Sequence, residues 1–328
     1  MNRVAEYLDY VRSVRRYSRR TCEVYADVLE RYFAFAAGPD SEAPGDVVPS
    51  RDSIRNYEVH LLDDEGLDAR TVGLHLSVLS GYCRFLMKRG DLESNPVRTV
   101  KRPKVEKRLP EFFRQEAMEH YLEQTAHAAG PDELELLLAE PAGSALWREL
   151  YERRLRRLVV SLLYATGIRR GELAGLVRGS FDPARGVLHV RGKGDKMREI
   201  PLVPSICEEI SLYLIAVSSL TGESEDPADP LLKTAGGAKL YPVWIDRAVK
   251  RELGGSQEFT GRKSPHTLRH TLATELLDGG TDLNSIKELL GHSSLAATQV
   301  YTHNSVQRLQ SVYNNAHPRA KNGGKNGD

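Results

Sequence analysis

Four side chains near the C-terminus could together cut a phosphodiester. His266, Arg269, His292 and Tyr301 follow one another within 36 residues. A guanidinium group can donate two parallel hydrogen bonds to phosphate oxygens, and a phenol surrounded by cations can act as a nucleophile. The order therefore predicts a cationic site that holds a phosphodiester while Tyr301 attacks it.

Two further cations stand upstream. Arg169 is followed three positions later by Glu172, so the carboxylate can anchor the guanidinium on one helical face, although a surface salt bridge would also explain this pair. Lys193 lies in the turn Gly192–Asp195, between predicted strands at 186–191 and 196–202. This turn joins two strands and lacks the Ser or Thr of a P-loop, so no ATP or GTP binding is expected.

The spacing of His266 and His270 also occurs in zinc proteases. That chemistry has a Glu after the first His, where this chain has Thr267, and no third ligand is evident. Each His alone could be structural, and Tyr301 alone could be a core or interface tyrosine. The combination in one order favours catalysis, and we expect neither a metal nor another cofactor.

Helical periodicity dominates the first hundred residues, with no strand signal. Cap residues precede three of the apolar runs: Ser18, then Ser50 or Asp52, then Asp68. With the run from Val4 to Val14, the pattern predicts a four-helix N-terminal domain over residues 1–100. An ordinary bundle with no special role would show the same periodicity.

The fold class predicted for the whole chain is mainly α with a small β-sheet. Residues 101–110 are basic and bounded by prolines, which predicts an extended linker. A mixed α/β domain is expected at 111–318 and a disordered tail at 319–328. The acidic segment 130–143 is expected to form an inserted surface helix or loop.

Apolar patterns in the second domain predict five helices, three of them with defined inner faces. In 151–166 the leucines are expected to face inward and four arginines outward. Helices are also expected at 205–220 and 241–253. Expected inward in the helix from Pro265 and in the helix 282–290 are Leu268, Leu272, Leu276, Leu277, Leu283, Ile286 and Leu290.

Composition sets mild limits on the class of protein. The chain has 328 residues, of which 40% are hydrophobic and 28% charged, enough for two domains with buried cores. Cys22, Cys83 and Cys207 are widely spaced and are expected to be small hydrophobic residues in a reducing compartment. No signal peptide or long apolar run is evident, so a cytoplasmic protein without membrane contact is expected.

The net charge of +1 gives no support to nucleic-acid binding, but the distribution of charge does. Residues 88–108 hold eight Lys or Arg against three acidic residues, and residues 151–200 hold twelve against five. A neutral chain can still present a basic face to phosphates. A solvated surface without a ligand is the alternative explanation of both segments.

Taken together, residues 105–318 resemble the tyrosine site-specific recombinases. The likeness rests on Thr166–Leu173, on Ser264–His270 and on the stretch from Leu289 to His303. The stretch 264–303 and the ending His317–Ala320 most resemble the Xer recombinases, which resolve chromosome dimers. The helical domain resembles the family's core-binding, SAM-like domain, and the resemblance implies a C-clamp of the two domains around DNA.

The resemblance also implies the catalytic residues. Tyr301 would attack the scissile phosphate, form a 3′-phosphotyrosyl bond and release a 5′-hydroxyl, without metal or ATP. Glu172 and His270 would support the site without taking part in the chemistry. The implied catalytic set is Arg169, Lys193, His266, Arg269, His292 and Tyr301.

The implied partners follow from recombination of two duplexes. They are double-stranded DNA with an inverted-repeat core site and a homo- or heterotetramer on two such sites. A second Xer recombinase and a septal DNA translocase are further candidate partners. Residues 304–313 would form a helix that docks on a neighbouring protomer, or packs in cis.

Three alternatives stay open. The chain could be the integrase or invertase of a mobile element with the same chemistry. It could be a DNA-binding protein without catalysis, or a type IB topoisomerase, which uses the same chemistry to relax DNA without site preference.

Overall fold

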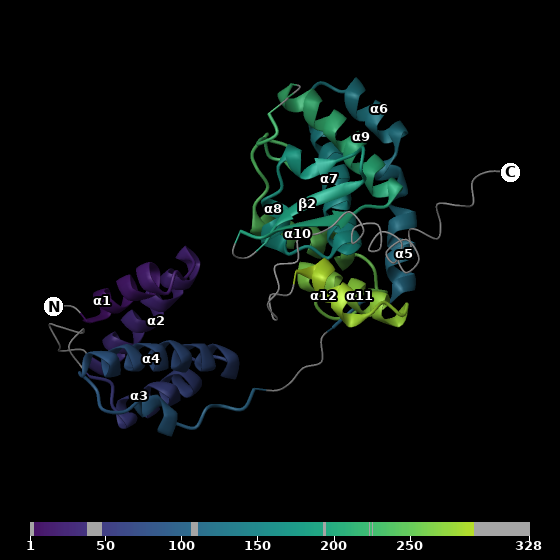
Figure 1. Cartoon of the computed structure of the whole chain (residues 1–328). Coiled ribbons are helices and arrows are strands. Elements are labelled where there is room, and N and C mark those ends of the chain that lie inside the picture. Colours follow the sequence, from purple (N-terminus) through teal and green to yellow (C-terminus); the bar gives the residue numbers. More distant parts are fainter. Residues whose placement is uncertain are drawn as a thin grey trace. The chain divides into compact units, whose positions relative to one another are not determined.

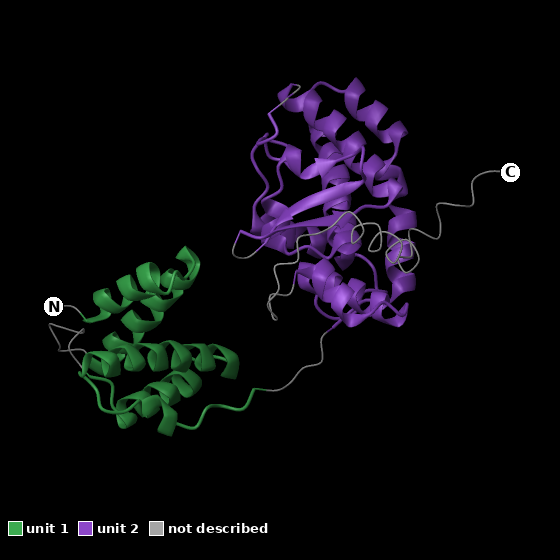
Figure 2. Cartoon of the chain, in the orientation of Figure 1, with its two compact units in different colours: residues 1–108 green, residues 109–328 purple. Residues whose placement is uncertain are grey.

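The chain folds into two compact units, residues 1–108 and 109–328 (Figure 2). A computed structural model describes residues 3–37, 48–105, 111–192, 195–222, 224 and 226–291. The predicted linker 101–110 spans the boundary between the units, and its residues 106–110 lie outside the described ranges. The predicted helix 304–313 and the tail 319–328 also lie outside them.

Unit 1 is a bundle of helices around an aromatic core, as the sequence predicted (Figure 1). Tyr32 is fully buried and packs edge-on against Tyr57, while Tyr82 packs in the same way against Phe33. Edge-to-face packing is a favoured geometry for aromatic pairs. The helices are α1 (Arg3–Asp9), α2 (Arg19–Ala37), α3 (Arg51–Val59), α4 (Ala69–Arg89) and the 3₁₀ helix η3 (Pro96–Thr99).

The two halves of unit 1 have the same construction. In each, a helix ends in a π-helical turn, η1 (Tyr10–Val14) or η2 (His60–Asp64). A residue with positive φ follows, Arg16 at 51° and Gly66 at 65°. The next helix is then capped by Ser18 Oγ or by Asp68 Oδ1, as predicted. The repeated left-handed residue reverses the chain and lets each pair of helices pack as a hairpin.

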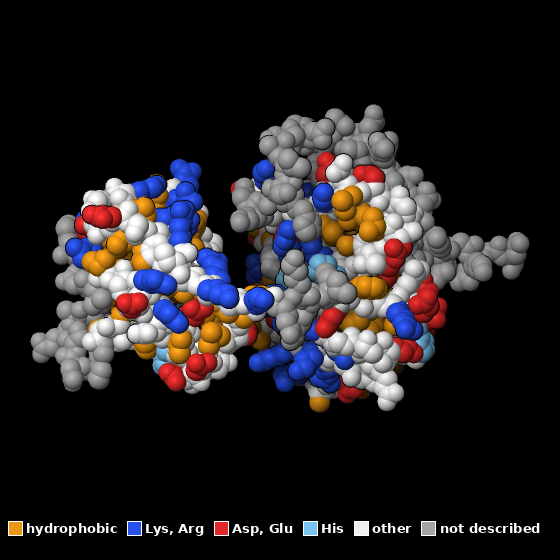
Figure 3. Space-filling view, turned by 90° about the horizontal axis from the view of Figure 1, so that it is seen from below, with side chains coloured by type: hydrophobic (Ala, Val, Ile, Leu, Met, Phe, Trp, Pro, Cys, Tyr) orange, Lys and Arg blue, Asp and Glu red, His pale blue; other side chains and the backbone are white. Residues whose placement is uncertain are grey.

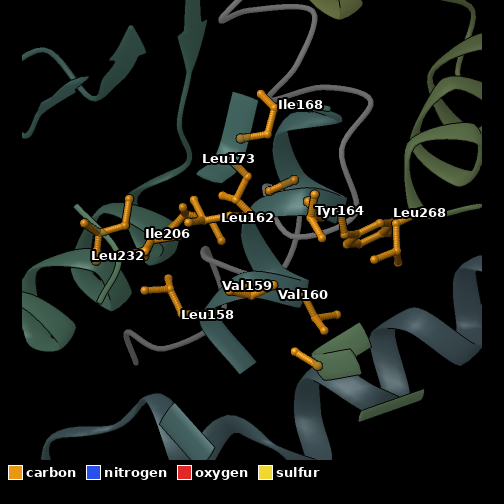
Figure 4. Packing of buried hydrophobic residues seen from close by; sticks show 14 of the residues in the cluster. Leu158, Val159, Val160, Leu162, Tyr164, Ile168, Leu173, Ile206, Leu232 and Leu268 are labelled. Atoms are coloured by element: carbon orange, nitrogen blue, oxygen red, sulfur yellow. The ribbon is translucent and has the colours of Figure 1, made fainter. Parts of the chain in front are cut away.

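Unit 2 is organised around one central helix, α7 (Ala145–Thr166). Its residue Leu158 is buried on one side of the helix and Val160 and Tyr164 on another, and other helices pack around it (Figure 4). A helix that is buried all round must be covered by neighbours on every face. The elements that pack against α7 are η4 (Ala126–Ala129), α6 (Pro131–Ala139), α9 (Pro204–Thr221), α10 (Pro242–Gly254) and α11 (Pro265–Asp278). Unit 2 also contains α5 (Gln115–Gln124), α8 (Arg170–Ala174), η5 (Arg178–Ser180) and α12 (Leu283–Leu290).

The sheet of unit 2 is small and antiparallel, in the order β1-β2-β3. The predicted hairpin is present as β2 (Val187–Arg191) and β3 (Met197–Pro201). Its end is closed by the Gly192 amide, which donates to the Lys196 carbonyl at 2.8 Å. The sequence missed β1 (Phe181–Asp182), because two residues are too few to show alternation. Among the described residues, no helix is long and apolar enough to cross a bilayer.

The prediction that the arginines of α7 face outward is wrong for three of the four. Arg154 and Arg157 are only 1% and 2% exposed, and Arg156 is buried as well. Arg154 donates to the carbonyls of Ala129 and Gly130, at 3.0 and 2.6 Å. Because α7 is covered on every side, its guanidinium groups have to find buried partners. The number of Lys and Arg residues in 151–200 is therefore larger than the number of positive charges that this segment presents on the surface.

The acidic segment 130–143 is not merely a surface insertion. Its helix α6 places Leu134 and Leu137 in the core of unit 2. Glu133 is buried and accepts a hydrogen bond from Arg153 Nε at 2.5 Å. One face of α6 is thus part of the core.

Two leucines predicted to be buried are exposed instead. Leu277 in α11 is 53% exposed and Leu283 in α12 is 54% exposed. Both stand beside the Gly279-Gly280 turn, at helix ends beyond the reach of the core. The inner face of α12 consists of Ile286, Leu289 and Leu290.

A buried carboxyl group on α11 makes the stability of unit 2 depend on pH. Burial raises the pKa of Glu275 to about 7, against 4.5 for a free group, although the Tyr164 hydroxyl donates to both of its oxygens. The folded state therefore holds a proton that the unfolded state releases between pH 4.5 and 7. The stability of the chain should fall by about 3 kcal/mol as the pH rises through this window.

Replacing Glu275 with Gln should remove this loss of stability at higher pH, because the amide has nearly the same shape as the carboxyl group and cannot ionise. We expect Glu275→Gln to unfold at higher denaturant concentration than the unsubstituted chain at pH 8, with little difference at pH 4. Urea denaturation at both values measures this, with exposed Glu288→Gln as the control. An equal shift at both pH values would contradict the assignment.

Candidate active site

Three of the six predicted catalytic residues lie in the described chain, and all three are in unit 2. Arg169 is the residue before α8, while His266 and Arg269 are on the first turns of α11. Lys193, His292 and Tyr301 lie outside the described residues. The geometry of the site is therefore that of Arg169, His266 and Arg269 with their neighbours.

The start of α11 is set by its own sequence. Ser264 Oγ accepts a hydrogen bond from the Thr267 amide at 3.3 Å, and Pro265 occupies the first helical position. This start leaves His266 exposed at the helix end and turns Arg269 inward. The cap formed by Ser264 and Pro265 thus sets the start of the helix, and with it the outward position of His266 and the inward position of Arg269.

Arg169 and Glu172 form the ion pair that their spacing predicted. Arg169 Nη1 lies 2.9 Å from Glu172 Oε1, and the Arg169 amide donates to Glu172 Oε2 at 2.9 Å. The second arm, Nη2, donates to the Gly291 carbonyl at 2.9 Å. The orientation of the Arg169 guanidinium is thereby fixed by a carboxylate on one arm and a backbone carbonyl on the other.

Arg269 is buried, and its described hydrogen-bond partners are backbone carbonyls. Its Nη1 donates to the Gly167 carbonyl and its Nη2 to the Leu290 carbonyl, both at 2.5 Å. Burial, together with the positive charge of Arg169, lowers the pKa of Arg269 to about 10. It stays charged at neutral pH, so Arg169 and Arg269 bring two cations to adjacent carbonyl groups at the end of α12.

The glycine that follows α7 allows this close approach. Gly167 has φ of 58°, and a Cβ there would lie 2.5 Å from Leu290 Cδ2 and 3.0 Å from Leu272 Cδ2. The first contact is closer than Cβ atoms approach in proteins, and the second is tighter than most. Gly167 thus brings the end of α7 against α11 and α12 and lets its carbonyl reach Arg269.

Sequence reasoning missed Arg198, the third arginine of this cluster. Arg198 is 7% exposed, and its Nη1 and Nη2 donate to the two oxygens of Glu172 at 3.2 and 2.7 Å. Burial would raise the pKa of Glu172, but hydrogen bonds from Arg198 and Arg169 outweigh it and hold that pKa below its usual value. Strand alternation was the available signal, since Arg198 and Ile200 share the inner face of β3.

His266 is suited to accept a proton. Although the side chain is exposed, partial desolvation by its neighbours lowers its pKa, and the proximity of His270 and Arg269 lowers it further. It is therefore largely neutral at pH 7, the form in which an imidazole nitrogen can take a proton. Together the three residues offer two fixed cations and one neutral base.

Basic side chains also gather on the surface of both units. In the view of Figure 3, Lys and Arg side chains outnumber acidic ones on parts of each unit. A surface of this kind attracts polyanions over several ångströms.

Comparisons with known proteins cover almost the entire chain. Residues 114–308 match the phage integrase family, and residues 4–90 match the phage integrase N-terminal SAM-like domain. The chain is 32% identical to tyrosine recombinase XerC of Chlorobaculum tepidum, over 97% of this chain and 94% of that protein. It is 31% identical to XerC of Bacillus subtilis, over 97% of both chains.

A solved structure supports the same fold. The XerH recombinase bound to its difH substrate matches with a TM-score of 0.60 and 19% identity, over 94% of this chain and 81% of that one. The predicted mainly helical fold with a small sheet and the predicted family are both confirmed. The chain therefore belongs to the phage integrase family: it is a tyrosine recombinase, an enzyme of site-specific DNA recombination, and its relatives are of the Xer type.

Proposed function

We propose that the chain cuts and rejoins DNA at an inverted-repeat site through Tyr301, in an Xer-like role that resolves chromosome or plasmid dimers. One observation supports this most directly: Arg169, Arg198 and Arg269 surround a single carboxylate, Glu172. The cluster keeps a net charge of +2, and like charges repel strongly when they are buried. A phosphodiester, whose charge grows during attack, is a suitable counter-ion.

Each catalytic residue has a role that matches its chemistry. Tyr301 attacks phosphorus and becomes bonded to the 3′-phosphate, while the bond to the 5′-oxygen breaks. Arg169 and Arg269 bind the non-bridging oxygens as charge develops, and His292 adds a hydrogen bond to them. Lys193 donates a proton to the leaving 5′-oxygen.

His266 completes the proton balance of the step. It accepts the proton that leaves Tyr301, consistent with the lowered pKa that keeps its imidazole neutral. The phosphotyrosyl bond retains the energy of the broken phosphodiester, so rejoining requires no ATP.

The proposed assembly has four protomers on two duplexes. Among matching structures, a lambda integrase tetramer is bound to a Holliday junction, with a TM-score of 0.59. For this chain we propose the same stoichiometry, with the two units closing as a clamp on each duplex, in the cytoplasm. A second Xer recombinase and a septal DNA translocase are the partners that this role would need.

Plasmid resolution tests the proposal. DNA fragments bound by the chain are selected from the genome that encodes it, and two copies of the selected site are cloned as direct repeats on a supercoiled plasmid. In EDTA, we expect the chain to convert this plasmid into two smaller circles, alone or with a second recombinase from the same genome. A plasmid without the sites should remain supercoiled.

Other results would redirect the assignment. Relaxation of both plasmids would indicate a topoisomerase. Resolution only at the ends of a mobile element would indicate an integrase. Tight binding without cleavage under any of these conditions would indicate a non-catalytic DNA-binding protein.

A further inference from the structure

Three arginines hold three consecutive carbonyl groups at the end of α12. Arg198 Nε donates to Leu289 O at 3.1 Å, Arg269 Nη2 to Leu290 O at 2.5 Å, and Arg169 Nη2 to Gly291 O at 2.9 Å. The last carbonyls of a helix have no partner within the helix and carry the negative end of its dipole. The arginines thus come from three separate elements and share one helix end.

Among the described contacts, Arg198 differs from the other two in that all three of its guanidinium nitrogens donate to groups of the protein, whereas Arg169 and Arg269 donate from Nη1 and Nη2. Its two Nη atoms bind both oxygens of Glu172, and its Nε binds Leu289 O. Arg169 depends on the same carboxylate, through Glu172 Oε1. Arg198 therefore links the carboxylate that orients Arg169 to the helix end that orients both Arg169 and Arg269.

Two glycines fit closely around this guanidinium. A Cβ at Gly291 would lie 3.1 to 3.3 Å from three atoms of Arg198, and φ at Gly291 is 65°. A Cβ at Gly192 would lie 3.4 Å from Arg198 Nη1. In the sequence, Gly192 directly precedes Lys193 and Gly291 directly precedes His292. The same guanidinium thus lies against the backbone next to two more of the proposed catalytic residues.

We propose that Arg198 is a positioning residue for the cleavage step, which fixes Glu172 and the end of α12 so that Arg169 and Arg269 present their guanidinium groups to the scissile phosphate. This inference rests on the proposed function. A lysine could supply the charge but not the three bonds, since an ammonium lacks the planar fork that spans a carboxylate and a carbonyl. A merely structural ion pair would stabilise the fold without favouring charge on the phosphate.

The test compares cleavage of two substrates by Arg198→Gln and Arg198→Lys. One nicked duplex carries the natural phosphodiester, and the other carries a methylphosphonate at the scissile position, which lacks one charged oxygen. Single-turnover cleavage is followed at saturating DNA, alongside duplex affinity and thermal unfolding. Arg185→Gln is the matched control, because Arg185 also binds a glutamate, Glu199, through two hydrogen bonds but is exposed.

We expect Arg198→Gln to cleave the phosphodiester about 10²-fold more slowly, because Arg169 would be misplaced as a donor to the developing oxyanion, and loss of one such donor has an effect of about this size. The defect should shrink to within about tenfold on the methylphosphonate, because less charge has to be stabilised there. The cleavage rate of Arg198→Lys should lie between those of Arg198→Gln and the unsubstituted chain. Arg185→Gln should cleave at the rate of the unsubstituted chain. Duplex affinity should change little in all of them.

Two results would overturn the inference. One is a rate for Arg198→Lys within threefold of the unsubstituted chain, whether or not Arg198→Gln folds. The other is a defect of equal size on both substrates, which would indicate a structural role alone. If the unsubstituted chain itself formed no adduct on the phosphodiester, the proposed function would fail instead, so the two failures are distinguishable.

Discussion

Replacing Tyr301 with Phe is expected to abolish the covalent protein–DNA adduct. The substitution removes the attacking oxygen and keeps the ring, so DNA binding should persist while cleavage falls by at least about 10⁴-fold, as when other enzymes lose their nucleophile. A nicked suicide duplex, from which the cut fragment diffuses away, traps the adduct. Denaturing electrophoresis in EDTA then measures both the adduct and its independence from metal ions.

A tyrosine elsewhere in unit 2 provides the control. Tyr241 is exposed at the start of α10, and Tyr241→Phe should form the adduct at the normal rate. If Tyr301→Phe still formed an adduct, the nucleophile would be a different residue. If the adduct formed only with added Mg²⁺, the arginine-based chemistry proposed above would be wrong.

Replacing Arg269 with Gln is expected to slow cleavage by about 10² to 10³-fold at saturating DNA. Loss of one donor to a developing oxyanion has this effect in other enzymes. The buried charge of Arg269 is held beside Arg169 by the carbonyls of Gly167 and Leu290, so its direction toward a ligand is set before DNA binds. Single-turnover adduct formation measures the rate, and thermal unfolding shows whether the variant remains folded.

Arg148→Gln is the control for the loss of one positive charge from the chain. Arg148 is exposed on the first turn of α7, and its replacement should leave the rate unchanged. Arg269→Lys keeps the charge but cannot bind both carbonyls, so we expect it to stay at least about tenfold slower than the unsubstituted chain. A normal rate for Arg269→Gln would remove Arg269 from the proposed catalytic set.

Short-range signals account for most of what could be predicted about the elements. The caps at Ser18, Ser50 and Asp68 start α2, α3 and α4, because a side-chain oxygen three residues upstream satisfies a free amide wherever the helix lies. The hairpin around Gly192 was equally visible in its alternation and turn residues. These features depend on residues close together in the sequence, so they can be predicted without the tertiary structure.

Which side chains of a predicted helix are exposed and which are buried was harder to predict. Leu277 and Leu283 have apolar side chains at helical spacing, yet both are exposed because their helix ends extend past the core. Arg154 and Arg157 are among the most polar side chains in the chain, yet they are buried because neighbouring elements offer carbonyls and carboxylates. Periodicity states which residues share a face but not what covers that face.

The family and the candidate catalytic residues could be predicted without a structure, because they follow from the types of these residues and their order in the chain. How Arg169 and Arg269 are held, and that Arg198 joins them, became known only from the packing of the elements. Their partners are the carboxylate of Glu172 and the end carbonyls of α12, which lie far from most of them in the sequence. Backbone carbonyls carry no sequence signature, so a cluster built on them becomes visible only when α7, β3, α11 and α12 are packed together.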